Sequence, residues 1–119
     1  MPTTTALANP SYTAIPHPAT GHFPSFSAFY PFYLGEHSNA ICRRLHLIGT
    51  SGVVATLVTA AVLKTPRALM YVPVIGYTFA WVGHFFFEKN KPATFTYPLW
   101  SLMADFKMFW EVLSMKRAF

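Results

Sequence analysis

Charged side chains are scarce in this sequence. They make up 11% of its 119 residues, whereas a soluble domain carries about 25%. Hydrophobic residues make up 53%, so only a small part of the chain is suited to face water. The length allows one domain and is too short for two.

Cysteine is almost absent, since Cys42 stands alone. A single cysteine excludes an intrachain disulfide and a zinc site built from cysteines. We interpret Cys42 as a small apolar residue near the start of a helix.

The first 22 residues contain no charged side chain and no apolar run. They therefore do not form a secretory signal. Their prolines and threonines predict a disordered tail over 1–22, followed by a single membrane domain over 23–119.

The net charge of +5 could indicate nucleic acid or anionic lipid as a partner. Nucleic-acid binding requires a basic stripe among polar neighbours, and the sequence has none. The basic residues instead lie in pairs at the edges of apolar runs, which is typical of anchors for membrane helices. We therefore expect membrane lipid and no nucleic acid as a partner. The pairs are Arg43 and Arg44, Lys64 and Arg67, Lys89 and Lys91, and Lys116 and Arg117.

Two apolar stretches, 45–63 and 68–87, are each close to the ~20 residues that a helix needs to cross a bilayer. The first is rich in glycine, alanine, serine and threonine, which allow close approach of helices in lipid. Residues 64–67 form a turn in which Pro66 ends the first helix. The pattern predicts a hairpin of two spans.

Amphipathic segments flank this hairpin. Residues 23–44 carry aromatic side chains at helical spacing, and Ser25 could cap a helix there. Residues 99–117, after Pro98, place their apolar side chains on one stripe, which predicts a helix along the membrane interface or packed on the hairpin. The predicted fold is therefore all-α: an integral membrane helical hairpin flanked by interfacial amphipathic helices.

The lysines and arginines are more numerous outside the predicted turn than in it. Two lie in residues 23–44, five in 88–119, and two in the turn. The positive-inside bias then favours both termini in the cytoplasm.

Four ionisable residues lie at one end of the predicted hairpin: His37, His46, His84 and Glu88. Ionisable groups near or inside a membrane segment are costly and usually functional. Two or three histidines with a carboxylate are the ligands expected of a non-haem iron(II) or zinc centre. His84 and Glu88 are four residues apart and share a helix face, so they could also act as an oriented general base.

His37 and His46 are nine residues apart and would point about 180° apart on one helix, at ~100° per residue. They can reach one site only if the chain breaks between them, and Asn39 could supply the break. Simpler interpretations remain: the histidines could bind lipid head groups, and Glu88 could pair with a nearby lysine. Arg43 and Arg44 are expected to be lipid-facing anchors. The stripe of Tyr77 and Trp81 is expected to pack rather than to line a pocket.

Three motifs resemble the Mpo-like family of short helical membrane proteins, long described as a domain of unknown function. They are Tyr33-x-x-x-His37, His46-x-x-Gly49 and the run from Gly83 through His84 and Glu88 to Ala93, and the resemblance covers about residues 23–117. The characterised fungal branch of that family is an iron(II)-dependent 2-hydroxy fatty acid dioxygenase of alpha-oxidation at the endoplasmic reticulum. The chain departs from the pattern after Gly49, where the family often has a proline, and the fungal enzymes are longer with more spans.

The resemblance implies a ferrous centre with His37, His46 and His84 as metal ligands and Glu88 as a catalytic residue, ligand or partner of a ligand. It also implies a fatty-acyl substrate and, because short versions are typical of bacteria, the inner membrane. A chain with two spans would enclose such a site better as a homo-oligomer. The alternatives are a non-enzymatic membrane protein that binds lipid or a partner protein, and a metal-independent hydrolase. No serine or cysteine stands in an evident nucleophile arrangement, which weakens the hydrolase interpretation.

Overall fold

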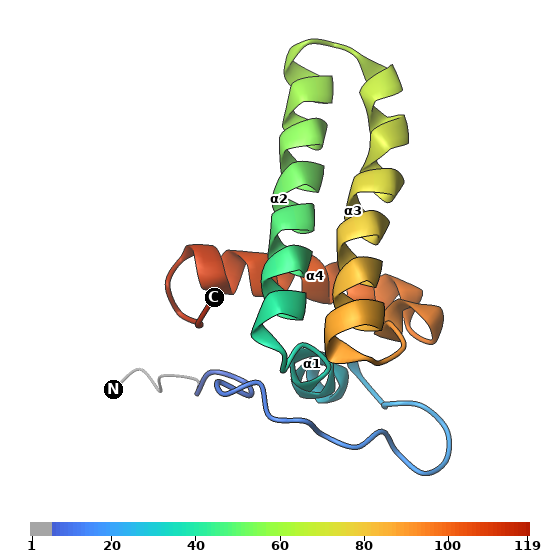
Figure 1. The fold of residues 1–119 in the computed structure, drawn as a ribbon, viewed down its shortest axis with the longest axis vertical. Helices are drawn as coiled ribbons and strands as arrows, with labels where there is room; N and C mark the ends of the chain where they lie inside the picture. Colours follow the sequence, from blue (N-terminus) through green and yellow to red (C-terminus); the bar gives the residue numbers. More distant parts are fainter. Residues whose placement is uncertain (1–5) are drawn as a thin grey trace.

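A long helical hairpin stands on a layer of shorter elements in the computed structural model, which describes residues 6–119 (Figure 1). All regular structure in this part of the chain is helical, and no strand occurs there. The rising arm of the hairpin is a single α-helix, and the descending arm joins a 3-10 turn, an α-helix and a π-helical turn. These elements are α2 (Ala40–Val62), η1 (Pro66–Met70), α3 (Tyr71–Val82) and η2 (Gly83–Glu88).

Both arms of the hairpin are long and apolar enough to cross a membrane, which confirms the predicted hairpin of two apolar helices. Each arm has 23 residues, or about 35 Å at ~1.5 Å per residue, and a bilayer core is ~30 Å thick. Many large apolar side chains point outward near the turn, among them Val62, Leu63 and Met70. The first helix ends at Val62, before Pro66, and Pro66 instead begins η1.

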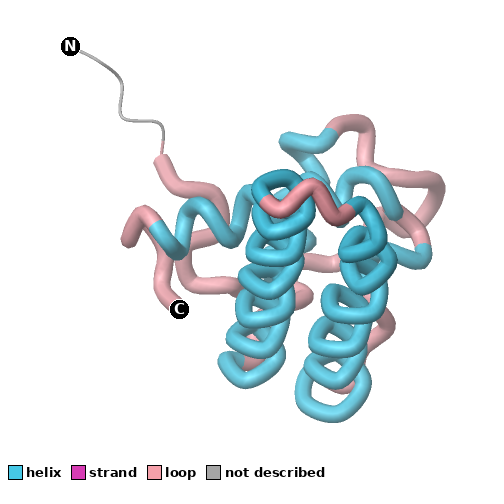
Figure 2. The backbone as a smooth tube through the Cα atoms, turned by 90° about the horizontal axis from the view of Figure 1, so that it is seen from above, coloured by secondary structure: helices cyan, strands magenta, loops and turns pink. Residues whose placement is uncertain are grey.

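Small residues allow the two arms to pack closely, as predicted. A Cβ on Gly49 would lie 2.7 Å from the Cβ of Phe79, and one on Gly52 would lie 2.8 Å from Cγ2 of Ile75. At the base, a Cβ on Gly83 would lie 3.0 Å from the carbonyl oxygen of Cys42. Figure 2 shows the two arms side by side when viewed down the hairpin, with the shorter elements spreading beyond them.

The base layer contains α1 (Phe26–Gly35), η3 (Ala93–Phe95) and α4 (Pro98–Leu113). Ser25 caps α1 as predicted, since its Oγ accepts a hydrogen bond from the backbone N–H of Ala28 at 3.2 Å. The buried core lies here, between α1 and α4 with a contribution from α2. Its central members are Phe29, Tyr30, Tyr33, Leu34, Leu47, Ala104 and Met108.

The helix α4 buries Ala104 and Met108 in the core but leaves large apolar side chains on its outer face. Its apolar side chains Leu99, Leu102 and Trp110 are more than half exposed, whereas the polar Ser101 and Glu111 are buried. An apolar face left outward beside an apolar hairpin is the arrangement expected of a helix that lies on a membrane.

The N-terminal segment lies along the base and is packed in part, although the sequence predicted a disordered tail over 1–22. Residues 6–22 form no helix or strand, yet Tyr12 is only 4% exposed. The buried Arg117 donates hydrogen bonds to the carbonyl oxygens of Ala8 and Asn9. Amino-acid composition could not predict this packing, because the hydrogen bonds are accepted by backbone oxygens, which every residue has. The part of the predicted tail over 1–5 lies outside the described residues.

Candidate metal centre

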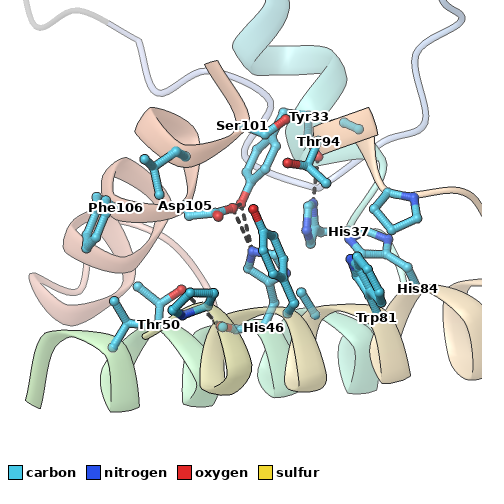
Figure 3. A pocket seen from close by; sticks show the side chains of 18 of the residues that line it. Tyr33, His37, His46, Thr50, Trp81, His84, Thr94, Ser101, Asp105 and Phe106 are labelled. Carbon is cyan, nitrogen blue, oxygen red and sulfur yellow. Dashed lines mark hydrogen bonds and ion pairs between the residues drawn. The ribbon is translucent and has the colours of Figure 1, made fainter. Parts of the chain in front are cut away.

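Three buried histidines meet where the hairpin joins the base layer (Figure 3). His37 follows α1, His46 lies in the second turn of α2, and His84 lies in η2. The ring centroids of His37 and His46 are 4.7 Å apart, those of His37 and His84 4.6 Å, and those of His46 and His84 5.8 Å. One nitrogen from each ring lies within 4.8 Å of the others, close enough for a single metal ion.

A break between α1 and α2 brings His37 and His46 together, as the sequence required. Asn39 caps α2, because its Oδ1 accepts hydrogen bonds from the N–H groups of Ile41 at 2.9 Å and Cys42 at 3.1 Å. On the other arm, η2 is a single π-helical turn that contains His84. Such turns interrupt α-helices frequently at functional sites.

Each histidine ring makes a short hydrogen bond to an oxygen. Nδ1 of His37 lies 2.7 Å from the carbonyl oxygen of Tyr33, and Nδ1 of His84 lies 2.8 Å from Oδ1 of Asn90. Nε2 of His46 lies 2.6 Å from Oδ1 of Asp105. Since these oxygens accept hydrogen bonds, the named nitrogens carry the protons and the opposite nitrogen of each ring keeps its lone pair.

Two of these free nitrogens have the surroundings expected of metal ligands. Nε2 of His37 and Nδ1 of His46 are buried without any hydrogen-bond partner, and such orphaned polar atoms are rare in folded proteins. Burial and the neighbouring imidazoles of His46 and His84 hold the pKa of His37 well below its usual range, so its ring is neutral. Neutral imidazoles whose other nitrogen donates to a carboxylate, amide or carbonyl are the usual form of histidine ligands.

Asp105 and Tyr33 support the cluster from the base layer. The Tyr33 hydroxyl donates to Oδ1 of Asp105 at 2.6 Å, the same oxygen that accepts from His46. Burial and Asp105 raise the pKa of Tyr33, which keeps this hydroxyl protonated. The role of Asp105 was not predicted from the sequence. Asp105 is the single aspartate in a chain with four acidic residues, which was the available signal for its role.

Glu88 does not line the histidine cavity. Its carboxylate accepts hydrogen bonds from the hydroxyl of Ser38 and, at 2.5 Å, from the backbone N–H of Asn39. It therefore ties the end of the hairpin to the α1–α2 junction, and these contacts do not favour the catalytic role predicted for it. Asn90, two residues later, makes the bond to His84 that Glu88 was expected to offer.

A cavity of about 270 Å³ extends from the histidines between the hairpin and α4 (Figure 3). Its polar end includes Tyr33, Asp105 and the buried Ser101, whose Oγ has no hydrogen-bond partner. Contrary to the expectation of simple packing, Tyr77 and Trp81 line the cavity. No lysine or arginine is among the described residues that line it. The apolar part is formed by Val53, Val72, Pro73, Gly76, Ala80, Leu102 and Phe106.

Arg43 and Arg44 differ in role, although the sequence predicted two lipid-facing anchors. Arg43 is buried, and its guanidinium donates to the carbonyl oxygen of His37 at 2.9 Å. It therefore holds the loop that carries this histidine, whereas Arg44 is exposed. Cys42 is buried with its Sγ 3.8 Å from Nδ1 of His84, in agreement with its interpretation as a small packing residue.

The fold and the site define a class of protein: short and all-helical, with an apolar hairpin and three histidines gathered at its base. The chain belongs to the Mpo1-like family, described as 2-hydroxy-palmitic acid dioxygenase Mpo1-like, whose model matches residues 23–117. This confirms the resemblance noted in the sequence, and the matched region contains all three histidines. Searches of curated proteins and of solved structures gave no match.

Proposed function

We propose that this protein is a membrane-embedded, iron(II)-dependent dioxygenase that shortens 2-hydroxy fatty acids by one carbon. The observation that carries the proposal is the three-histidine cluster, with each ring oriented by its own oxygen partner, at the end of an apolar cavity. The family's description supplies the substrate class. The reaction balances as RCH(OH)COOH + O2 → RCOOH + CO2 + H2O, in which dioxygen is the only oxidant.

The histidines would hold the metal through Nε2 of His37, Nδ1 of His46 and the ring nitrogen of His84 that faces away from Asn90. A bound ferrous ion would supply the redox chemistry through which dioxygen attacks the substrate. Tyr33, Asp105 and Asn90 are positioning residues, because they fix the tautomer and orientation of the rings. Asp105 is also the only charged group among the ring partners.

The cavity would hold the substrate with its carboxylate and 2-hydroxyl beside the histidines and its tail among Val53, Val72 and Gly76. The apolar walls exclude water from the reacting atoms. Since no lysine or arginine of the described chain lines the cavity, a metal held by the histidines would supply the counter-charge for the substrate's carboxylate.

The hairpin is proposed to cross the membrane, with the base layer in the head-group region and α4 lying on its surface. We also propose the bacterial inner membrane as its location, and the distribution of basic residues favours both termini in the cytoplasm. A homo-oligomer remains a prediction.

The test is metal analysis of the detergent-purified protein, prepared without oxygen. We expect about one iron per chain in the wild type, because three imidazoles form one site, and loss of iron in His84→Ala. The matched control is His22→Ala, an exposed histidine outside the cluster. Iron-loaded protein should then convert 2-hydroxypalmitate to the acid one carbon shorter, measured by mass spectrometry. Absence of metal in both proteins would contradict the proposal and favour a lipid-binding protein without catalysis.

A further inference from the structure

The cavity has a mouth that faces sideways, between the descending arm of the hairpin and α4. Deep lining residues such as His37, His46 and Ala80 are buried, whereas Tyr77 is 49% and Leu102 53% exposed. The helix α4 packs on α1, α2 and η3 but has little packing against α3. The gap between α3 and α4 is therefore the side on which the cavity meets the surroundings.

The surroundings of this mouth are apolar on both sides. On α4, Leu99 and Met103 flank Leu102 and are exposed, and on α3 the exposed neighbours include Val74. These are the outward faces that would contact lipid if the hairpin crosses a bilayer. With the hairpin in a bilayer, the mouth would therefore open toward acyl chains rather than toward water.

The long axis of the cavity runs along the hairpin. On the descending arm the lining extends from His84 up to Val72, or about 18 Å at ~1.5 Å per residue. One leaflet is roughly half of the ~30 Å hydrocarbon core, so the cavity has the depth of one leaflet. Its polar end lies at the base layer and its apolar end inside the hairpin, which is the orientation of a fatty acid already dissolved in the membrane.

We propose that the cavity takes up a single-chain fatty acid laterally from the surrounding leaflet, through the gap between α3 and α4. The acid slides in with its head at the level of the histidines, so it neither leaves the membrane nor reverses its orientation. A volume of about 270 Å³ and the absence of a lining cation in the described chain favour one unesterified chain over a phospholipid or a highly charged thioester. This inference rests on the membrane placement under the proposed function.

The test uses the full-length protein in lipid nanodiscs with a photoreactive 2-hydroxy fatty acid that carries a diazirine at mid-chain. After illumination, labelled residues are mapped by mass spectrometry. We expect labels on the inner lining, at Val53, Gly76 or Phe106. Leu102→Trp should abolish these labels by filling the mouth, while Leu99→Trp, on the same exposed face but outside the cavity, should leave them unchanged.

Labels confined to the outer face of the hairpin, or cavity labels unaffected by Leu102→Trp, would overturn the proposal. A second copy of the chain that covers the gap would also overturn it. Native mass spectrometry would then show a dimer that Leu102→Trp dissociates, while the cavity labels persist. The labelling does not require catalytic turnover, so the experiment tests lateral uptake independently of the proposed dioxygenase activity. Cavity labels without oxidation would overturn the dioxygenase alone, and oxidation without cavity labels would overturn the lateral uptake alone.

Discussion

The three histidine rings differ in the oxygen that each one meets. His37 donates to a backbone carbonyl and His84 to an amide oxygen, whereas His46 donates to the carboxylate of Asp105. A carboxylate partner makes an imidazole a stronger electron donor than a neutral partner does. Asp105 should therefore have the largest influence on the metal of the three partners.

Replacing Asp105 with asparagine should weaken iron binding by about 10–100-fold, the usual cost of losing such a partner. The change keeps the side chain's shape and removes only its charge. Iron affinity would be measured by competition with a chelator, with Lys107→Gln on the same helix as the control. Unchanged affinity in Asp105→Asn would show that the carboxylate does not act on the ligand.

The sequence predicted the histidines but not their partners, for a physical reason. A histidine near the end of an apolar run is conspicuous because it is costly there. Asp105 lies on an amphipathic helix whose sequence does not show which polar residues face the interior. Only the packing of α4 on α1 and α2 brings it to His46. A hydrogen bond between residues 59 positions apart leaves no local pattern in the chain.

The junction between α1 and α2 is held by Glu88, the last residue of the descending arm. Its carboxylate accepts from Ser38 and Asn39 just before α2 begins. This is a helix cap supplied by another element, and it ties the start of α2 to the end of the descending arm.

Glu88→Ala should lower the stability of the protein by about 0.5–2 kcal/mol, the usual range for a lost helix cap. Iron content should stay close to that of the wild type, because Glu88 does not reach the cavity. Thermal unfolding and metal analysis would be compared with Lys89→Ala, an exposed neighbour. If turnover were lost while both stability and iron content persisted, Glu88 would have the catalytic role first predicted for it.

The glycines at the contact between the two arms differ in how much room they leave for a side chain. Gly49→Val should cost about 1–3 kcal/mol through overpacking, because its Cβ would lie 2.7 Å from the Cβ of Phe79. Gly76→Ala is the matched control, since its Cβ would make an ordinary contact of 3.4 Å with Val53. Denaturation in graded detergent mixtures would measure both, and equal stability of the two variants would contradict the close packing.

Hydropathy and small residues were enough to predict the hairpin, because each arm is one continuous apolar segment. The descending arm is less regular than predicted, since η1 and η2 replace its first and last turns. A π-helical turn depends on what packs against it, here Cys42 beside Gly83, and that contact cannot be read from local sequence.

The two ends of the described chain are joined beneath the hairpin by a buried polar network. Arg117 bonds to Glu111 at 3.3 Å and to the carbonyl oxygens of Ala8 and Asn9. Glu111 also accepts from the hydroxyl of Tyr30. The network holds the N-terminal segment against α1 and α4, and it explains how residues without regular structure stay packed.

Arg117→Met should release this segment, because its carbonyl oxygens lose their donor and Glu111 loses its counter-charge. Breaking a buried ion pair costs about 3–5 kcal/mol, so we expect a lower unfolding temperature and faster proteolysis within residues 8–22. Lys116→Met, an exposed neighbour, should change neither. Equal proteolysis of the two variants would show that the segment is held by other contacts.

The separation of the three histidines along the chain also sets the order in which the protein can mature. His37 and His46 are synthesised before the hairpin is complete, and His84 reaches them only after the two arms have paired. Two imidazoles alone make an incomplete site, so the nascent chain would bind a metal only weakly. Under the proposed function, metal loading would follow the pairing of the two arms, and a chain whose arms have not paired would stay free of a redox-active ion.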